Sequence, residues 1–184
     1  MRLDNKIALV TGAAGDIGST TARRFAEEGA TVILSDINKE GCVKVLEELQ
    51  HKGGKGGIIT GDLTKENDVL DIFSQLMSEY NRLDIIANIA GGDYENMVAV
   101  DDISYEKMSY NIDVNLKSCI LCCREAAKIM MEQEYGKMVN TATAFLVGCG
   151  AINIYRWRGI AILIGLQQKI DSKSRVPYTR TRNC

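Results

Sequence analysis

A glycine-rich loop is the first segment of this sequence whose residue types and spacing suggest chemistry. It reads Thr11-Gly-Ala-Ala-Gly-Asp-Ile-Gly18 and stands between an apolar run and the start of a helical pattern. Glycines at a strand-to-helix turn let the backbone approach a pyrophosphate, and the N–H groups of the helix N-terminus attract negative charge. The loop therefore predicts a phosphate-binding turn, although any strand-to-helix turn favours small residues.

Asp36 strengthens this interpretation, because it follows the second apolar run and lies eighteen residues after Gly18. A carboxylate at that place can accept hydrogen bonds from both hydroxyls of a ribose, and its charge repels the 2′-phosphate of NADP. The pattern favours NAD as the cofactor, with NADP the less favoured. The alternative for Asp36 is a helix N-cap ahead of Asn38. Asp16 disagrees with the pattern, because an acidic side chain beside a pyrophosphate must point away or cap the helix.

Five apolar runs alternate with helical patterns and supply the elements that position these residues. The runs are Ile7–Val10, Thr31–Leu34, Gly57–Thr60, Leu83–Ala87 and Lys137–Thr141, and the helical patterns lie near residues 17–29, 39–51, 66–80, 103–132 and 155–170. Apolar runs of this kind are typical of parallel strands that helices cover on both faces. We expect an α/β fold of Rossmann type, with a doubly wound parallel sheet in three α/β/α layers. The glycine-rich stretch 53–57 is interpreted as a turn after a helix.

Length, composition and charge exclude several classes of protein. A chain of 184 residues with 46% hydrophobic and 25% charged residues indicates a single globular domain over residues 1–184. The formal net charge of -2 offers no basic surface for nucleic acid. The sequence runs straight into its first apolar strand without a leader, which predicts a cytoplasmic protein. The apolar stretch 159–166 is shorter than the roughly 20 residues of a membrane span and is interpreted as a buried helix.

Six cysteines raise the question of a disulfide or zinc framework. Cytosolic thiols stay reduced, and a structural zinc site takes four ligands from paired motifs. Cys119, Cys122 and Cys123 lie within a helical apolar pattern, where a free cysteine behaves as a small hydrophobic residue. We expect these three side chains to pack in the core, and we expect no metal site.

Three further motifs follow the later strands. They are Asp62-Leu-Thr64, Asn88-Ile-Ala-Gly91 and Asp113-Val-Asn-Leu116. Together with the glycine loop and Asp36, their order and spacing resemble those of the short-chain dehydrogenase/reductase family over residues 3–155. The resemblance implies an NAD(P)-dependent oxidoreductase that moves a hydride between nicotinamide and a small-molecule alcohol or ketone.

The same resemblance implies which residues contact the cofactor. They are Thr11, Gly12, Gly15, Asp16, Ile17, Gly18, Asp36, Ile37, Asp62, Leu63, Asn88, Ala90 and Gly91. Asp62 matches the residue that holds the adenine amino group. Ile89 replaces the second asparagine of the family's turn, which implies a lost hydrogen bond. Asn115 matches the asparagine that holds a helix kink and a proton-relay water, the alternative being a polar residue that faces solvent.

The catalytic residues implied by the resemblance are Asn115, Thr143 and Tyr155. A phenol has a pKa of roughly 10, so Tyr155 needs a nearby cation to act as a base at neutral pH. The family places a lysine four residues later, where this chain has Gly159, and Arg158 cannot replace a lysine fully. Thr143 matches the family serine. A one-residue shift in the alignment before Tyr155 would instead place Ala142 at this position, and Thr143 is equally interpretable as an ordinary strand residue.

The resemblance is poor after Tyr155, where family members continue with two more strands and a segment that covers the substrate. A shifted or truncated reading frame and divergence to a non-catalytic role both explain this loss. Two hypotheses therefore stand: a working oxidoreductase, or a catalytically impaired NAD-binding remnant with a regulatory role or no enzymatic role. In the family, the helix at 155–170 and the helix of Cys119 pack across a subunit interface, which implies a homo-oligomer. Residues 92–102 either line the pocket mouth or form a surface loop.

Overall fold

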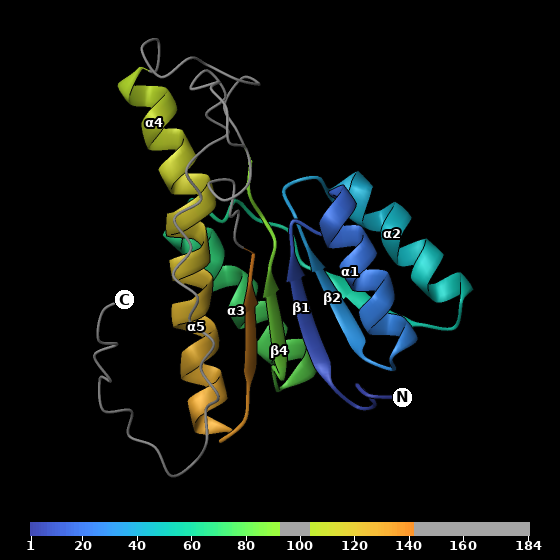
Figure 1. The fold of residues 1–184 in the computed structure, drawn as a ribbon. Coiled ribbons are helices and arrows are strands. Elements are labelled where there is room, and N and C mark those ends of the chain that lie inside the picture. Colours follow the sequence, from blue (N-terminus) through green and yellow to red (C-terminus); the bar gives the residue numbers. More distant parts are fainter. Residues whose placement is uncertain (93–103, 142–184) are drawn as a thin grey trace, which may run out of the picture.

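A computed structural model describes residues 1–92 and 104–141 of the chain. Their strands form one parallel sheet in the order β3-β2-β1-β4-β5 (Figure 1). The strands are β1 (Ile7–Thr11), β2 (Thr31–Ser35), β3 (Lys55–Ile58), β4 (Ile85–Asn88) and β5 (Lys137–Asn140). The predicted doubly wound fold is confirmed, and the strand order reverses between β1 and β4. The expected loss of the family's last strands concerns residues after 141 and lies outside the described residues.

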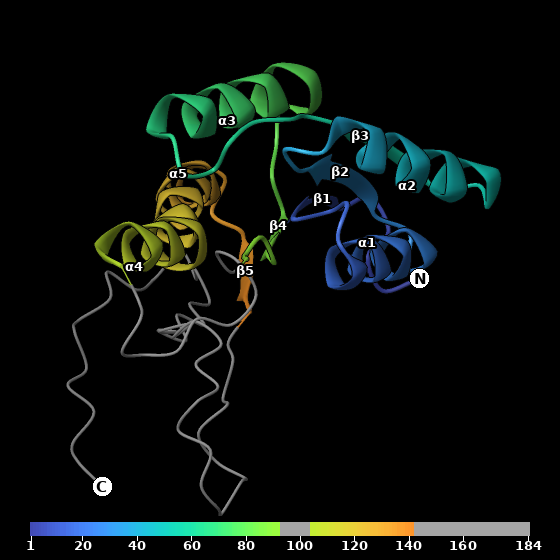
Figure 2. The same ribbon diagram turned by 90° about the horizontal axis from the view of Figure 1, so that it is seen from above.

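Helices cover both faces of this sheet (Figures 1 and 2). They are α1 (Asp16–Glu27), α2 (Lys39–His51), α3 (Glu66–Tyr80), α4 (Tyr105–Ile112) and α5 (Ser118–Glu132). A π-helical turn, η2 (Asp113–Lys117), joins α4 to α5, so the single long helix expected near 103–132 contains an irregular turn. Across residues 1–92 and 104–141, none of the helices has the length and apolar character that a membrane span requires.

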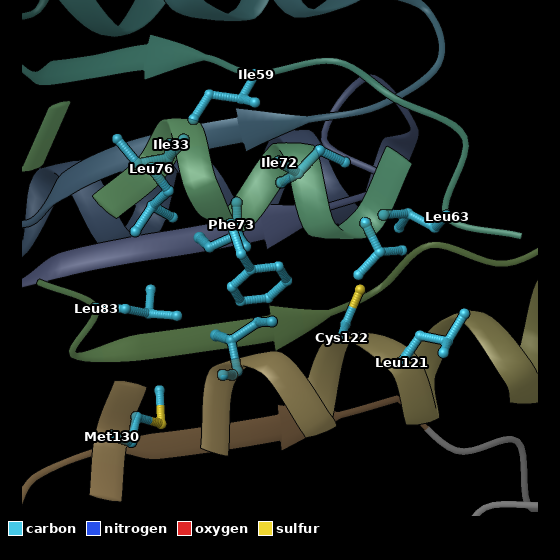
Figure 3. Packing of buried hydrophobic residues seen from close by; sticks show 14 residues of the cluster. Ile33, Ile59, Leu63, Ile72, Phe73, Leu76, Leu83, Leu121, Cys122 and Met130 are labelled. Atoms are coloured by element: carbon cyan, nitrogen blue, oxygen red, sulfur yellow. The ribbon is translucent and has the colours of Figure 1, made fainter. Parts of the chain in front are cut away.

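Alternate strand residues point to opposite faces of the sheet and form two hydrophobic layers. Leu9, Ile33 and Ile86 belong to the cluster with residues of α3 and α5 on one face. Figure 3 shows Ile33 in this cluster with Phe73 of α3 and Cys122 of α5. Ala8 and Val10 pack with α1 and α2 on the other face. The apolar runs of β1, β2 and β4 are therefore continuous because helices cover both faces of these central strands, whereas the edge strands β3 and β5 also contain exposed residues.

The third strand begins earlier than the sequence pattern predicts. It spans Lys55–Ile58 instead of residues 57–60, with Gly56 opposite Val32 of β2. A Cβ on Gly56 would collide with the carbonyl oxygen of Val32, and a Cβ on Gly57 would collide with the hydroxyl of Tyr80. The interpretation of the whole stretch 53–57 as a turn is thus wrong, since its last two glycines belong to the sheet and allow close packing.

Candidate functional site

The candidate site lies where the strand order reverses, at the carboxyl ends of β1 and β4. Parallel α/β sheets bind ligands at such a point because the connections leave the strands in opposite directions. The hydroxyl of Thr11 accepts hydrogen bonds from the backbone N–H groups of Ile89 (3.0 Å) and Ala90 (3.1 Å). Thr11 therefore connects the glycine loop to the turn after β4. Because the donors are backbone N–H groups, these hydrogen bonds do not depend on the side chain at position 89.

The glycine loop is closed so tightly that two of its glycines have no room for a side chain. Gly12 has a φ of +64°, and a Cβ there would lie 2.8 Å from the backbone nitrogen of Ala90. A Cβ on Gly18 would collide with the carbonyl oxygen of Gly12. These two positions require glycine because the protein's own backbone occupies the space that a side chain would take, and this close packing shapes the turn that leads into the N–H groups at the start of α1.

The start of α1 is suited to an anion. Its N-cap is Gly15, so no side chain accepts hydrogen bonds from the first turn. Asp16 is exposed and does not cap the helix. Its carboxylate therefore weakens the positive end of the helix dipole only partly, since solvent screens an exposed charge.

Asp36 lies beside the glycine loop and is hydrogen-bonded to it. Its Oδ2 accepts from the backbone N–H of Ala14 (3.0 Å), and its Oδ1 accepts from that of Asn38 (2.9 Å). The alternative of Asp36 as an N-cap is wrong, because Asn38 caps α2 by accepting from the N–H of Gly41 (2.9 Å). Ile37 next to it is 76% exposed.

In the motif after β3, the side chain of Asp62 interacts with neighbouring residues of its own turn. Asp62 accepts hydrogen bonds from the backbone N–H (3.0 Å) and hydroxyl (2.7 Å) of Thr64, and it pairs with Lys65 (3.2 Å). The Thr64 hydroxyl is the main reason that the pKa of Asp62 lies below its usual value. Leu63 is buried in the hydrophobic layer that α3 and α5 cover, so its side chain packs in the core.

Asn88, which is buried, and Asn140, which is partly buried, form an amide pair at the ends of β4 and β5. They are opposite each other in the sheet, and Nδ2 of Asn88 donates to Oδ1 of Asn140 at 2.8 Å. Thr141 donates from both its backbone N–H and its hydroxyl to the carbonyl oxygen of Asn88 (3.1 Å each). Sequence reasoning missed Asn140; an asparagine at the end of an apolar strand was the signal that could have found it.

Asn115 joins the irregular turn of the long helix to the loop after β4. Its Oδ1 accepts from the N–H of Gly92 (3.1 Å), and its Nδ2 donates to the carbonyl oxygens of Gly92 (2.7 Å) and Asn111 (2.9 Å). A Cβ on Gly91 would lie 2.8 Å from Asn115 Oδ1, so a side chain there would displace this amide. Asn115 is thus a bridging residue, and the alternative of a solvent-facing polar side chain is wrong.

The three cysteines of α5 do not share one environment. Cys122 is 1% exposed and packs in the core, as expected. Cys119 and Cys123 are only partly buried, and their sulfurs lie 3.5 and 3.4 Å from Oδ1 of Asn140. The expectation of core packing is wrong for these two, because residues four apart lie on one side of a helix and this side faces the end of β5.

The predicted catalytic residues Thr143 and Tyr155 lie outside the described residues, as do Arg158 and Gly159. Of the three catalytic candidates, the structure places Asn115. Within residues 1–92 and 104–141, no group of three or more His, Cys, Asp or Glu side chains could hold a metal ion.

The sheet order and the glycine loop define a Rossmann-type α/β protein. A family model described as short chain dehydrogenase matches residues 6–152, and the chain belongs to this family. It is 36% identical over 151 residues to the uncharacterized oxidoreductase YxjF of Bacillus subtilis (strain 168), covering 82% of this chain and 58% of the relative. It is also 36% identical over 144 residues to a 3beta-hydroxysteroid dehydrogenase of Mediterraneibacter gnavus, covering 77% of this chain and 51% of the relative.

Solved structures of the same class share the fold. An NAD+-bound xylitol dehydrogenase superposes with a TM-score of 0.75 at 29% identity, covering 78% of this chain and 55% of that chain. A metagenomic short-chain oxidoreductase in complex with NADP superposes with a TM-score of 0.73 at 26% identity, covering 78% of this chain and 65% of that chain. The chain thus resembles oxidoreductases with either cofactor, and it spans 51–60% of the length of the first three curated relatives.

Proposed function

We propose that this protein is an oxidoreductase that uses NAD to interconvert an alcohol and a ketone. The observation that carries the proposal is the position of Asp36 beside the glycine loop, held to Ala14 at 3.0 Å. The family to which the chain belongs supports the reaction class. Relatives named as dehydrogenases act on steroid and sugar alcohols, and from these names we take only the chemical class of the substrate for this chain.

The residues at the carboxyl ends of β1, β2 and β4 fit a dinucleotide. Gly12 and Gly18 allow the loop to close tightly on its own backbone, and the start of α1 offers N–H groups to the pyrophosphate. Asp36 is suited to the hydroxyls of the adenosine ribose and disfavours a 2′-phosphate by its charge. Ile17 and Ile37 are 67% and 76% exposed, and burial of such side chains against a bound ligand is favourable. When bound, NAD supplies the group that accepts or donates the hydride.

We assign the proton chemistry to Asn115, Thr143 and Tyr155. Thr143 donates a hydrogen bond to the substrate oxygen, and Tyr155 exchanges its proton. Asn115 is held at the loop after β4 by its bonds to Gly92, where it can orient a relay water. The comparisons lend no support to an impaired NAD-binding remnant. The features that this alternative explains are the absence of a lysine at position 159 and the loss of resemblance after Tyr155.

Turnover of alcohols with NAD, measured for the parent chain and a Gly159→Lys variant, tests the proposal. A lysine at position 159 lowers the pKa of Tyr155 and should raise turnover more than about tenfold, within the range of acid–base catalysis. Gly159→Met is the matched control, because it adds a side chain of similar length without the charge. Equal rates for all three chains, at saturating NAD, would reject this account of the proton chemistry.

The remaining expectations are proposals of the same kind. We propose a cytoplasmic protein whose 184 residues form one domain. We also propose a homo-oligomer, because large apolar side chains are exposed along α4 and α5: Tyr105, Met108, Ile112, Ile120 and Met131. Light scattering combined with size-exclusion chromatography tests the assembly, and a monomeric mass across the concentration range would contradict it.

A further inference from the structure

Asn140 lies where three elements meet: the end of β5, the end of β4 and one side of α5. Its Oδ1 accepts a hydrogen bond from Nδ2 of Asn88 at 2.8 Å. The sulfurs of Cys119 and Cys123 lie 3.5 and 3.4 Å from the same oxygen. An amide oxygen has two lone pairs, so the bond from Asn88 is the strong contact and a thiol supplies a weak second one. Asn140 is thus held mainly through Asn88.

Asn88 in turn depends on Asn140, because its amide is buried. The residue is 4% exposed, and its Oδ1 has no hydrogen-bond donor within the described part of the chain. Its Nδ2 donates to Asn140 and, at 3.3 Å, to the sulfur of Cys123. A buried polar atom without a partner lowers stability. Without Asn140, this amide would keep only the weak contact to sulfur.

The backbone of Asn88 is bonded to the residue that follows Asn140. The carbonyl oxygen of Asn88 accepts from the backbone N–H and from the hydroxyl of Thr141, at 3.1 Å each. Asn88 and Asn140 are also opposite each other in the register of β4 and β5. Three hydrogen bonds therefore join the same two strand ends. Together they fix the direction in which the chain leaves β5.

The turn that follows Asn88 is held on its other side by β1. The hydroxyl of Thr11 accepts from the N–H groups of Ile89 and Ala90 at 3.0 and 3.1 Å. A series of hydrogen bonds thus runs from the glycine loop through the end of β4 to the end of β5. This series connects the proposed cofactor site to the strand end that lies two residues before Thr143.

We propose that Asn140 is a positioning residue for the oxidoreductase reaction: through its bond to Asn88, it holds the end of β5 at a fixed place beside the turn after β4. The inference rests on the function proposed above, which assigns the hydroxyl of Thr143 to the substrate oxygen. Asn140 acts through the strand and is assigned no contact with the substrate. A reacting group that is misplaced by about 1 Å can lower turnover by about 100-fold. Loss of Asn140 should therefore slow the reaction and leave cofactor binding unchanged.

Hydrogen exchange at the backbone N–H of Thr141, followed by NMR of the full chain, tests the positioning without any activity. Asn140→Ala removes the bond to Asn88 and should make this exchange at least about fivefold faster, as expected for the loss of one hydrogen bond. Exchange at Ile86, in the middle of β4, should stay at the parent's rate. Asn140→Asp keeps an oxygen that accepts from Asn88 and should restore slow exchange at Thr141. Unchanged exchange at Thr141 in Asn140→Ala, or an equal acceleration at Ile86, would overturn the proposal.

Steady-state kinetics with NAD and an alcohol, beside a titration with NADH, measures the effect on the reaction. Asn140→Ala should lower kcat at least about tenfold with NADH affinity unchanged, and Asn140→Asp should recover most of kcat. Val139→Ala is the matched control and should keep the parent's kcat. Val139 is adjacent on β5, is 52% exposed and points to the opposite face of the sheet. The parent's kcat in Asn140→Ala, or an equal fall in kcat and NADH affinity, would overturn the proposal.

The two measurements separate this proposal from the function on which it rests. A parent chain that binds NADH and oxidises no alcohol would overturn the proposed oxidoreductase, and with it the role of Asn140 in the reaction. Exchange at Thr141 would still show whether Asn140 holds the end of β5.

Discussion

The carboxylate of Asp36 accepts a hydrogen bond of 3.0 Å from the backbone N–H of Ala14, so the end of β2 is joined to the glycine loop after β1. One residue thereby has two functions in our account. It fixes the loop that faces a pyrophosphate, and it presents a negative charge where NAD has a hydroxyl and NADP a phosphate.

Replacing Asp36 with asparagine should shift cofactor preference toward NADPH. The amide keeps an oxygen that can accept from Ala14 and removes the charge that repels a 2′-phosphate. We expect the ratio of the NADH and NADPH affinities to change by at least about tenfold, or 1.4 kcal/mol, in favour of NADPH. Fluorescence titration of both cofactors measures it.

Asp16→Asn is the matched control for that experiment, because it makes the same charge change at an exposed carboxylate of the same loop. Asp16 lies at the start of α1, where a negative charge opposes the pyrophosphate of both cofactors alike. Asp16→Asn should therefore tighten NADH and NADPH equally. A shift in preference as large as that of Asp36→Asn would show that net charge alone sets the preference.

Alanine at Gly18 should destabilise the fold. Its Cβ would collide with the carbonyl oxygen of Gly12, so the loop or the start of α1 must move. Overpacking of this kind lowers the free energy of unfolding by about 1–3 kcal/mol. Chemical denaturation monitored by circular dichroism gives the value.

Gly15→Ala provides the comparison, because a Cβ there would lie 3.4 Å from the carbonyl oxygen of Gly12. This variant should keep the parent's stability and lose NADH affinity, since its methyl group enters the space near the pyrophosphate. If both alanine variants unfold at the parent's denaturant midpoint, the loop is looser than the structure indicates.

Asp84→Asn should destabilise the amino-terminal ends of the central strands β1 and β4, which lie opposite the candidate site. Asp84 is fully buried and accepts from the backbone N–H of Ile7 (2.9 Å) and from Arg82 Nε (2.9 Å), with Lys6 3.6 Å away. Removing the charge leaves two cations without their buried partner, and we expect a loss of about 2 kcal/mol in the free energy of unfolding. Urea denaturation tests this, and unchanged NADH affinity in the folded variant checks that the effect is confined to stability.

Asn115→Ala should loosen the loop after β4. It removes three hydrogen bonds, two to Gly92 and one to Asn111, of which those to Gly92 are exposed to solvent. We expect about 1 kcal/mol lower stability and a larger fall in turnover than in NADH affinity. Steady-state kinetics beside a binding titration separates the two effects, and an equal fall in both would indicate a purely structural role.

The sequence pattern predicts the elements because apolar runs and helical periods reflect burial, and Val10 or Leu34 is buried in any doubly wound sheet. It places β3 too late, because glycines carry no hydrophobic signal and Gly56 is needed for close packing against β2. Composition likewise cannot separate Cys122 from Cys123, since their difference depends on which side of α5 faces Asn140. Thr11 accepts hydrogen bonds from residues 78 and 79 positions later in the chain, Ile89 and Ala90. Such contacts between distant residues produce no local sequence pattern, so they could not be predicted.

The central claim is that the residues at the carboxyl ends of β1 and β4 bind NAD, and fluorescence titration of the purified full chain with NADH and with NADPH tests it most directly. Our account predicts saturable binding of both, with NADH tighter than NADPH at the same ionic strength. A folded chain that binds neither cofactor, or that binds NADPH more tightly, would contradict the role given to Asp36 and the glycine loop.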